Sequence, residues 1–305
     1  MAPSDEANSS ETPDDRLPVL KTYKLYIGGK FPRTESGRFY APECDGQALG
    51  NLCLASRKDV RNAVTAARAA QSGWADRSAY NRSQILYRVA EMLEGRAEQF
   101  AAELQRQGLT RSQSTSEVQQ SIDRLVYYAG WCDKYQPIFS SVNPVASSHF
   151  NFSMLEPMGV VFLVASESSP LLGPISLLAP IIASGNSCVI LASESKPLSL
   201  VTFGEVLQTS DVSGGVVNVL TGRKSELSEH FSSHKDINAV AYDGDDSTLI
   251  NLIQQQATSN LKRVRIYHND WLDQTSANPY LIQDFCEVKT TWHPIEKISA
   301  SGSGY

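Results

Sequence analysis

The sequence predicts an α/β protein built on a doubly wound parallel sheet. From Gly159 onward, short β-branched runs recur at regular intervals, in the order GVVFLV, SCVIL, VVNVL, INAVAY and RVRIY. The segments between these runs have the length and the apolar periodicity of helices. Because a parallel crossover needs a helix of about this length, residues 159–275 are expected to form a sheet with helices on both faces.

Residues 20–135 are expected to supply a β-hairpin and a layer of helices. The stretch KLYIGGKFPRT (24–34) places a Gly-Gly turn between two short strand-like runs. Ser56 and Asp59 have the spacing of a capping box ahead of a helix at 59–74. Apolar residues then recur at helical spacing over 81–108 and 114–135, which predicts one helix in each range.

Two further segments have the alternation of strands with one apolar face. HFNFSML (149–155) falls within 136–158, and CEVKTTW (286–292) falls within 276–305. Strands of this kind are not stable alone in water. We therefore expect a small β arm formed by 136–158 and the C-terminal 276–305, unless both strands pack over the sheet of the same chain.

Composition limits the classes of partner and compartment. The chain has 305 residues, 41% of them apolar, and a formal net charge of −6 without any basic run interleaved with aromatics, which argues against nucleic acid. No apolar run approaches the ~20 residues that span a membrane. The five cysteines lack zinc spacing, which predicts no metal site and a cytoplasmic location. Residues 1–19 are acidic and Ser/Pro-rich, and are expected to be a disordered tail.

Several stretches together resemble the aldehyde dehydrogenase superfamily. Among them are YIGGKF, EPMGVVFLV, PLLGPISLLAPIIASGNSCVIL, GGVVNVLTG, SNLKRV and CEVKTTWHPI, in family order and spacing. The resemblance implies a nicotinamide-cofactor domain and an oligomerisation arm. In the family a long catalytic domain with a nucleophilic Cys separates the last two stretches, whereas here only 271–285 lie between Asp270 and Cys286. The chain is thus similar to the inactive second half of tandem family-16-type aldehyde dehydrogenases, with the catalytic domain absent.

The resemblance also implies that the catalytic positions are substituted. Tyr267 occupies the position of the family's general base, a Glu, and a phenol is a poor base at neutral pH. Ser168 occupies the position of the Asn that holds the oxyanion, and Glu167 precedes it. No segment resembles the family's nucleophile motif. We expect no catalytic residues, although residues 267–270 can equally be a solvated turn after a strand.

The resemblance implies that Glu194, Gly222 and Gly244 match cofactor-binding positions of the family, and that three other such positions are substituted. Leu191 replaces a ribose-binding Lys, Lys224 replaces a phosphate-loop Gly, and Asp245 replaces a Ser at the diphosphate. Two like charges about 4 Å apart repel by ~1 to ~4 kcal/mol, so NAD or NADP is expected to bind weakly or not at all. The plainer alternatives are that Asp245 or Asp246 caps a helix, and that Glu194 stabilises a helix start.

These observations predict a catalytically inactive aldehyde dehydrogenase-like protein that acts as an oligomerisation, regulatory or scaffold subunit. Its expected partner is a second copy or a complete aldehyde dehydrogenase, and the expected contact residues are Phe150, Phe152, Met154, Val288 and Trp292. One alternative is a working NAD(P)-dependent oxidoreductase for aldehydes with an atypical site. Another is a small-molecule sensor that uses the cofactor cleft, whose lining by Glu167, Asp243 and Asp245 suits a cation and not a nucleotide.

Overall fold

The central sheet has five strands and is parallel throughout. The computed structural model describes residues 19–295, so the terminal residues 1–18 and 296–305 of the expected tails lie outside the described part. The strands are β8 (Val160–Val164), β9 (Ser187–Leu191), β10 (Val217–Leu220), β11 (Ala239–Asp243) and β12 (Arg263–Tyr267). Their spatial order is β10-β9-β8-β11-β12. This confirms the doubly wound α/β fold, and the point at which the order of the strands reverses lies between β8 and β11.

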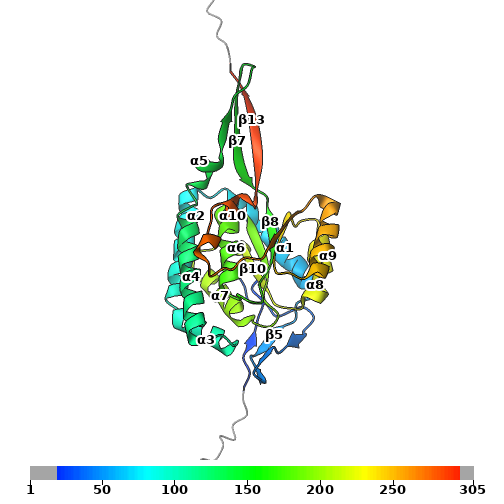
Figure 1. Ribbon diagram of the computed structural model, residues 1–305. Coiled ribbons are helices and arrows are strands. Elements are labelled where there is room, and N and C mark those ends of the chain that lie inside the picture. Colours follow the sequence, from blue (N-terminus) through cyan, green and yellow to red (C-terminus); the bar gives the residue numbers. More distant parts are fainter. Residues whose placement is uncertain (1–18, 296–305) are drawn as a thin grey trace, which may run out of the picture.

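Helices cover both faces of this sheet (Figure 1). The crossover helices are α6 (Leu172–Ala183), α7 (Leu198–Gln208), α8 (Lys224–Ser233) and α9 (Ser247–Ala257), and the short 3-10 turn η1 (Thr258–Asn260) follows α9. One core joins α6 and α7 to the sheet, and a second core joins α8, α9 and α1 (Arg57–Ala75) to its other face. Every residue of α6 is buried, because a further helical layer covers this helix on the side away from the sheet.

The outer layer differs from the expected single helix over 81–108. It consists of α2 (Ala79–Glu94), α3 (Ala97–Arg106), α4 (Arg111–Ala129) and the short α5 (Tyr135–Phe139). The break falls at Gly95, a poor helix former, and Arg96 leaves helical geometry with φ −118° and ψ 14°. Arg96 then pairs with Glu205 of α7, and the new direction of α3 buries Phe100 completely. Tertiary packing therefore decides the division of this segment.

The N-terminal segment contributes small sheets and one added edge. β1 (Thr22–Tyr23), β5 (Asn51–Cys53) and β2 (Phe39–Tyr40) form one sheet, and β3 (Glu43–Cys44) pairs with β4 (Gln47–Ala48). The Gly28-Gly29 turn forms with both residues at positive φ, and Ile27 bonds with Lys30 across it. The expected hairpin is short, because Tyr26 pairs instead with Val219 at the edge of the central sheet. The capping box of Ser56 and Asp59 is present.

The arm is a separate three-stranded sheet that extends away from the body (Figure 1). Its strands are β6 (Ser141–Asn143), β7 (His149–Pro157) and β13 (Cys286–Pro294), in the order β13-β7-β6. β7 and β13 pair antiparallel along nine residues each. The alternative in which both strands pack over the parallel sheet is wrong for this structure.

Residues 268–285, here called the connecting segment, join β12 to the arm. The segment contains η2 (Gln274–Ser276) and α10 (Tyr280–Gln283). It packs against the body through Trp271, Leu281, Ile282 and Phe285, all buried in the same core as α4 and α6. Arg124 donates to the Trp271 carbonyl at 3.0 Å, and the Tyr128 hydroxyl donates to the Asn278 carbonyl at 3.0 Å. This short segment closes the core at the point where the chain leaves the sheet. Over 19–295, the helices are too short or too polar to cross a bilayer.

Candidate functional site

A cavity of about 510 Å³ lies at the carboxyl edge of the sheet, between the ends of β8, β11 and β12. Sheets of this class bind ligands at such a reversal point. Its lining residues are Ser166, Glu167, Ser168, Lys224, Tyr242, Asp243, Gly244, Asp245, Asp246, Tyr267, His268 and Asn269. We call it the switch-point cavity. It brings together eight of the residues singled out from sequence, namely Glu167, Ser168, Lys224, Asp243, Gly244, Asp245, Asp246 and Tyr267. Leu191, Glu194 and Gly222 are not among its lining residues.

The carboxylate of Glu167 binds within this cavity as a ligand anion would. Its Oε1 lies 2.7 Å from the Lys224 Nζ and accepts a 3.0 Å bond from the Glu194 N–H. Its Oε2 accepts from the hydroxyls of Ser193 at 2.5 Å and Ser195 at 2.7 Å, and from the Ser195 N–H at 3.3 Å. Burial opposes ionisation of Glu167, but the bonds from Lys224, Ser193, Ser195 and Glu194 outweigh it and hold the pKa at about 2.

Glu194 is engaged with the start of α8. Its Oε1 accepts a short hydrogen bond from the Lys224 N–H, the first amide of that helix. A carboxylate at a helix N-terminus satisfies a free amide and complements the helix dipole. The expected role at a helix start is therefore present, for α8 instead of α7. One oxygen of Glu194, Oε1, is therefore already engaged with the protein's own backbone.

The starts of α6 and α7 are also occupied, in both cases by side chains from the outer helical layer. Glu117 of α4 accepts from the N–H groups of Leu171 at 2.9 Å and Leu172 at 3.1 Å. Burial raises the pKa of Glu117, although these bonds counteract that effect. Gln107 accepts from the Leu198 N–H at 2.8 Å. Amides at these helix starts are thereby removed from the set that could receive an external anion.

At α9 the helix cap is Asp246. Its Oδ1 accepts from Thr248 N–H at 2.9 Å and Leu249 N–H at 3.3 Å, so of the two aspartates proposed as caps, Asp246 is the one that acts. The phenol of Tyr242 covers Gly244 so closely that a Cβ there would lie 2.5 Å from its oxygen. Asp245 adds an exposed carboxylate beside them. Asp246 and Tyr242 therefore fill the space in front of α9.

Asp243 ends β11 and is the most buried acid of the cavity lining, at 6% exposure. Its Oδ2 accepts a 2.7 Å hydrogen bond from the indole Nε1 of Trp271, in the connecting segment. Burial raises the pKa of Asp243 to about 6, against the opposing effect of the Trp271 bond. A carboxyl of this kind holds its proton at mildly acidic pH and can accept or donate one near neutrality.

The two substituted catalytic positions are engaged in local contacts. The hydroxyl of Ser168 lies 2.9 Å from that of Ser166. The hydroxyl of Tyr267 donates to Asp284 Oδ2 at 2.9 Å, and burial raises the pKa of this phenol. Residues 268–270 are exposed, as the solvated-turn alternative expected, whereas Tyr267 is buried and, with Trp271, anchors the connecting segment to the sheet.

The remaining sequence candidates are structural. Leu191 is fully buried in the core and offers no polar group to a ligand. Gly222 lies against Leu227 and Ala55, where a Cβ would be 3.1 Å from the Leu227 side chain. No cysteine lines the switch-point cavity, and Cys53, Cys132, Cys188 and Cys286 are buried while Cys44 is partly exposed. Within 19–295 there is no group of three or more His, Cys, Asp or Glu suited to a metal ion.

The residues present do not fit a dinucleotide diphosphate. A diphosphate needs free amides at a helix start and cations or hydroxyls nearby. Here Glu117, Gln107, Glu194 and Asp246 each occupy such amides, and Glu167 pairs with Lys224, the lysine of the cavity lining, and accepts from Ser193 and Ser195 beside it. Sequence reasoning missed the part played by Glu117, Gln107 and Tyr242. The one signal present in the sequence is that both Glu167 and Lys224 depart from the family, which is consistent with an ion pair between them.

Comparison with known proteins identifies the family. The family model described as aldehyde dehydrogenase family matches residues 32–293. Cytosolic 10-formyltetrahydrofolate dehydrogenase of Mus musculus is 30% identical over 258 residues, which are 82% of this chain and 29% of that protein. The mitochondrial 10-formyltetrahydrofolate dehydrogenase of Homo sapiens is 27% identical over 281 residues, 90% of this chain and 30% of that protein.

Solved structures agree with this assignment. The NAD+ complex of aldehyde dehydrogenase from Bacillus cereus superposes with a TM-score of 0.77 at 26% identity, over 81% of this chain and 50% of that one. PnpE from Pseudomonas sp. WBC-3 gives 0.76 at 28% identity, with the same coverage. The chain spans about half the length of these structures and less than a third of the two curated relatives. The chain belongs to the aldehyde dehydrogenase family.

Proposed function

We propose that this protein is a catalytically silent member of its family that acts as an oligomerisation or regulatory subunit. The observation that carries the proposal is the position of Glu167. Its carboxylate pairs with Lys224, the lysine of the switch-point cavity, and accepts from Ser193 and Ser195 next to the cavity, so these donors are not free for a cofactor phosphate. A second anion placed there would meet Glu167, Asp245 and Asp246 at close range, and like charges oppose binding.

The cysteines support the same proposal. A catalytic thiol must be accessible and ionised near neutral pH. Burial raises the pKa of Cys132 and of Cys286 to about 12, and raises that of Cys188 as well. Cys44 is the most accessible of the five but lies on β3, outside the cavity lining.

Binding and turnover measurements test the proposal directly. Titration with NAD+ and NADP+, followed by the intrinsic fluorescence of the four tryptophans, is expected to give no saturable change. An aldehyde oxidation assay run in parallel is expected to give no reduced cofactor. A complete aldehyde dehydrogenase in the same buffers is the positive control. Saturable binding together with turnover would contradict the proposal.

A working NAD(P)-dependent oxidoreductase with an atypical site is the second candidate. One observation favours it, because Asp243 lines the cavity with a pKa of about 6, which suits a general base. If this candidate is correct, turnover should be measurable and should fall by ~10²-fold or more in Asp243→Asn. The same assay therefore separates the two functions.

The arm is the surface proposed for contact with a partner. Directly opposed residues of an antiparallel pair share a face, and Phe152 opposes Thr291 whereas Val288 opposes Leu155. Phe150, Phe152 and Met154 therefore lie on one face of the arm, and Val288 and Trp292 lie on the other. The five contact residues expected from sequence are therefore divided between two faces of the arm.

Both arm faces and one arm edge are open in the described chain. Phe150 is 44% exposed on the first face, and Trp292 is 57% exposed on the second. Within residues 19–295, no strand pairs with the outer edge of β13. Exposed apolar side chains beside an unpaired strand edge favour the addition of a strand or sheet from another chain. We propose a second copy or a complete aldehyde dehydrogenase as the source of that strand.

The two arm faces provide matched variants for this proposal. We expect light scattering after size exclusion to show an assembly larger than one chain, either alone or after mixing with a complete aldehyde dehydrogenase. The double variant Phe150→Ser/Met154→Ser tests one face and Val288→Ser/Trp292→Ser tests the other. The double variant on the face that contacts the partner should no longer assemble, whereas the double variant on the other face should assemble as the unchanged protein does. If the protein remains a monomer both alone and when mixed with a complete aldehyde dehydrogenase, the proposed role of the arm is wrong.

A further inference from the structure

A second cavity, of about 430 Å³, lies between the first turn of α1 and the last turn of α8. It shares no lining residue with the switch-point cavity. Its lining residues are Arg57, Val60, Arg61, Glu229, His230, Ser233, His234 and Lys235. We call it the basic cavity. Its volume is within the range of pockets that bind small molecules.

The cations of the basic cavity have no acidic partner. Within residues 19–295, no carboxylate lies within ion-pair distance of Arg57, Arg61 or Lys235. The neighbouring cations differ, since Arg38 pairs with Glu226 and Lys58 pairs with Glu35. A concentration of unpaired positive charge stands out in a chain whose formal net charge is −6.

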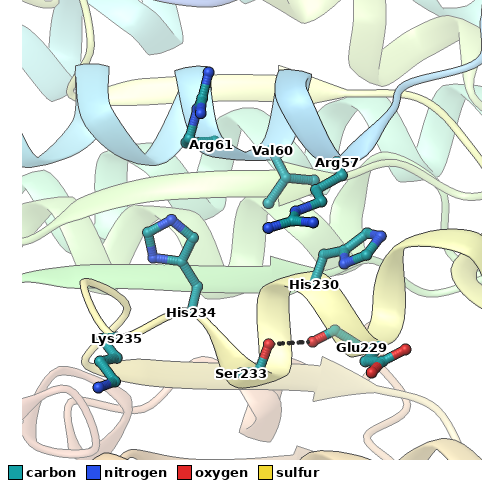
Figure 2. A pocket seen from close by; sticks show the side chains of 8 residues that line it. All are labelled: Arg57, Val60, Arg61, Glu229, His230, Ser233, His234 and Lys235. Carbon is teal, nitrogen blue, oxygen red and sulfur yellow. Dashed lines mark hydrogen bonds between the residues drawn. The ribbon is translucent and has the colours of Figure 1, made fainter.

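This concentration is unfavourable for the folded protein without a bound anion. Arg57 and Arg61 are four residues apart on α1, a spacing at which like charges repel, and Figure 2 shows their guanidinium groups directed away from each other. Both also lie in the first turns, where the helix dipole is already positive. Lys235, His230 and His234 approach from α8 and the loop after it. A bound anion would relieve each of these repulsions.

The arrangement of the side chains favours a phosphate group. Figure 2 shows the guanidinium of Arg57 between the two imidazoles, with the His234 ring on one side and the His230 ring on the other, and the carboxylate of Glu229 apart from all three. A guanidinium offers two parallel donors that match two oxygens of a phosphate, and the imidazoles add donors from other directions. Val60, which is buried in the core of α1 and α8, closes the inner end of the cavity.

We infer that the basic cavity binds a small phosphate-bearing molecule. Arg57 contributes the bidentate contact, and His230 and His234 flank the phosphate. Arg61 and Lys235 supply longer-range attraction. This inference is independent of the proposed silence of the switch-point cavity, because the two cavities are formed by different residues.

The five histidines make the site observable by NMR. His230 and His234 line the basic cavity, His268 lines the switch-point cavity, and His149 and His293 lie on the arm. Inorganic phosphate and phenyl phosphate, added at constant ionic strength, are expected to shift the imidazole signals of His230 and His234 saturably. The other three histidine signals are expected to stay in place. If phenyl phosphate binds more tightly than inorganic phosphate, the ligand of the basic cavity is an organic phosphate. If the two bind equally, the ligand is the inorganic ion.

Arg57→Gln is the decisive variant, and Arg111→Gln is its matched control. Both arginines are exposed and occupy the first position of a 19-residue helix that begins with a capping box. Since charge-assisted hydrogen bonds are about twice as strong as neutral ones, Arg57→Gln should weaken phosphate binding by about tenfold or more. Arg111→Gln should leave it unchanged. Equal affinity in both variants, or no saturable shift of His230 and His234 in the original protein, would overturn the inference.

Discussion

The charge of Glu167 should make a measurable contribution to the stability of the fold. Replacement by Gln keeps the shape of the side chain and removes the charge that Lys224, Ser193 and Ser195 surround. The isolated carboxyl has a pKa of 4.5, and the folded protein holds it at about 2. A depressed pKa means that the folded state favours the ionised form, so Glu167→Gln should lower the free energy of unfolding.

The size of the effect follows from the same values. A fall from 4.5 to about 2 corresponds to about 3 kcal/mol, at ~1.4 kcal/mol per pKa unit. The Glu167 side chain is 38% exposed, and solvent screening reduces this value. We therefore expect Glu167→Gln to lose about 1–2 kcal/mol at neutral pH. The loss should be complete above pH 4.5 and should shrink as the pH falls from there toward 2.

Urea unfolding followed by tryptophan fluorescence between neutral pH and pH 4 measures this difference. Glu35→Gln is the control, because Glu35 pairs with Lys58 at 2.8 Å while both side chains are about half exposed. A surface pair of this kind contributes only ~0.2–1 kcal/mol. The explanation would be refuted if both variants lost the same stability, or if the loss in Glu167→Gln did not begin to shrink below pH 4.5.

Other changes give distinct outcomes in the same unfolding assay. Burial raises the pKa of Asp243 from 3.8 to about 6, so the ionised form is disfavoured in the folded state. Asp243→Asn should therefore stabilise the protein by about 1–3 kcal/mol above pH 6, and this gain should disappear below pH 3.8. Trp271→Phe should destabilise by about 1–3 kcal/mol, since it leaves the buried Asp243 carboxylate without its donor; an unchanged midpoint would contradict that reading. Asp246→Ala should lose about 1 kcal/mol through the cap of α9, and Asp245→Ala less than about 0.5 kcal/mol. In native buffer a thiol reagent should label Cys44 first, and rapid labelling of the other four would show that the core opens more readily than their burial implies.

Much of the fold could be predicted from sequence because its signals are local. RVRIY and SCVIL have the bounds of β12 and β9, and α9 begins directly after its capping residue, Asp246. The capping box of Ser56 and Asp59 also lies within one short window. Each of these features depends on residues that are at most a few positions apart, so periodicity and capping rules are sufficient.

The site could be predicted only in part. The sequence indicated which positions depart from the family, and Lys224, Asp245 and Tyr267 do lie together at one cavity. It did not indicate that Glu167 would fill the space of a ligand. That contact joins the loop after β8 to residues that follow β9 and β10, 26 to 57 positions further along the chain. No local rule links residues so far apart.

The sequence by itself determined the alternation of strands and helices, the helix caps and the identities of the substituted residues. Tertiary structure alone decided three other features: the break at Gly95, the occupation of the start of α6 by Glu117 of α4, and the division of the arm side chains between two faces. The physical reason is that these features depend on the register and direction of elements that meet in space. Periodicity fixes which side of an element is apolar, and only packing fixes what that side contacts.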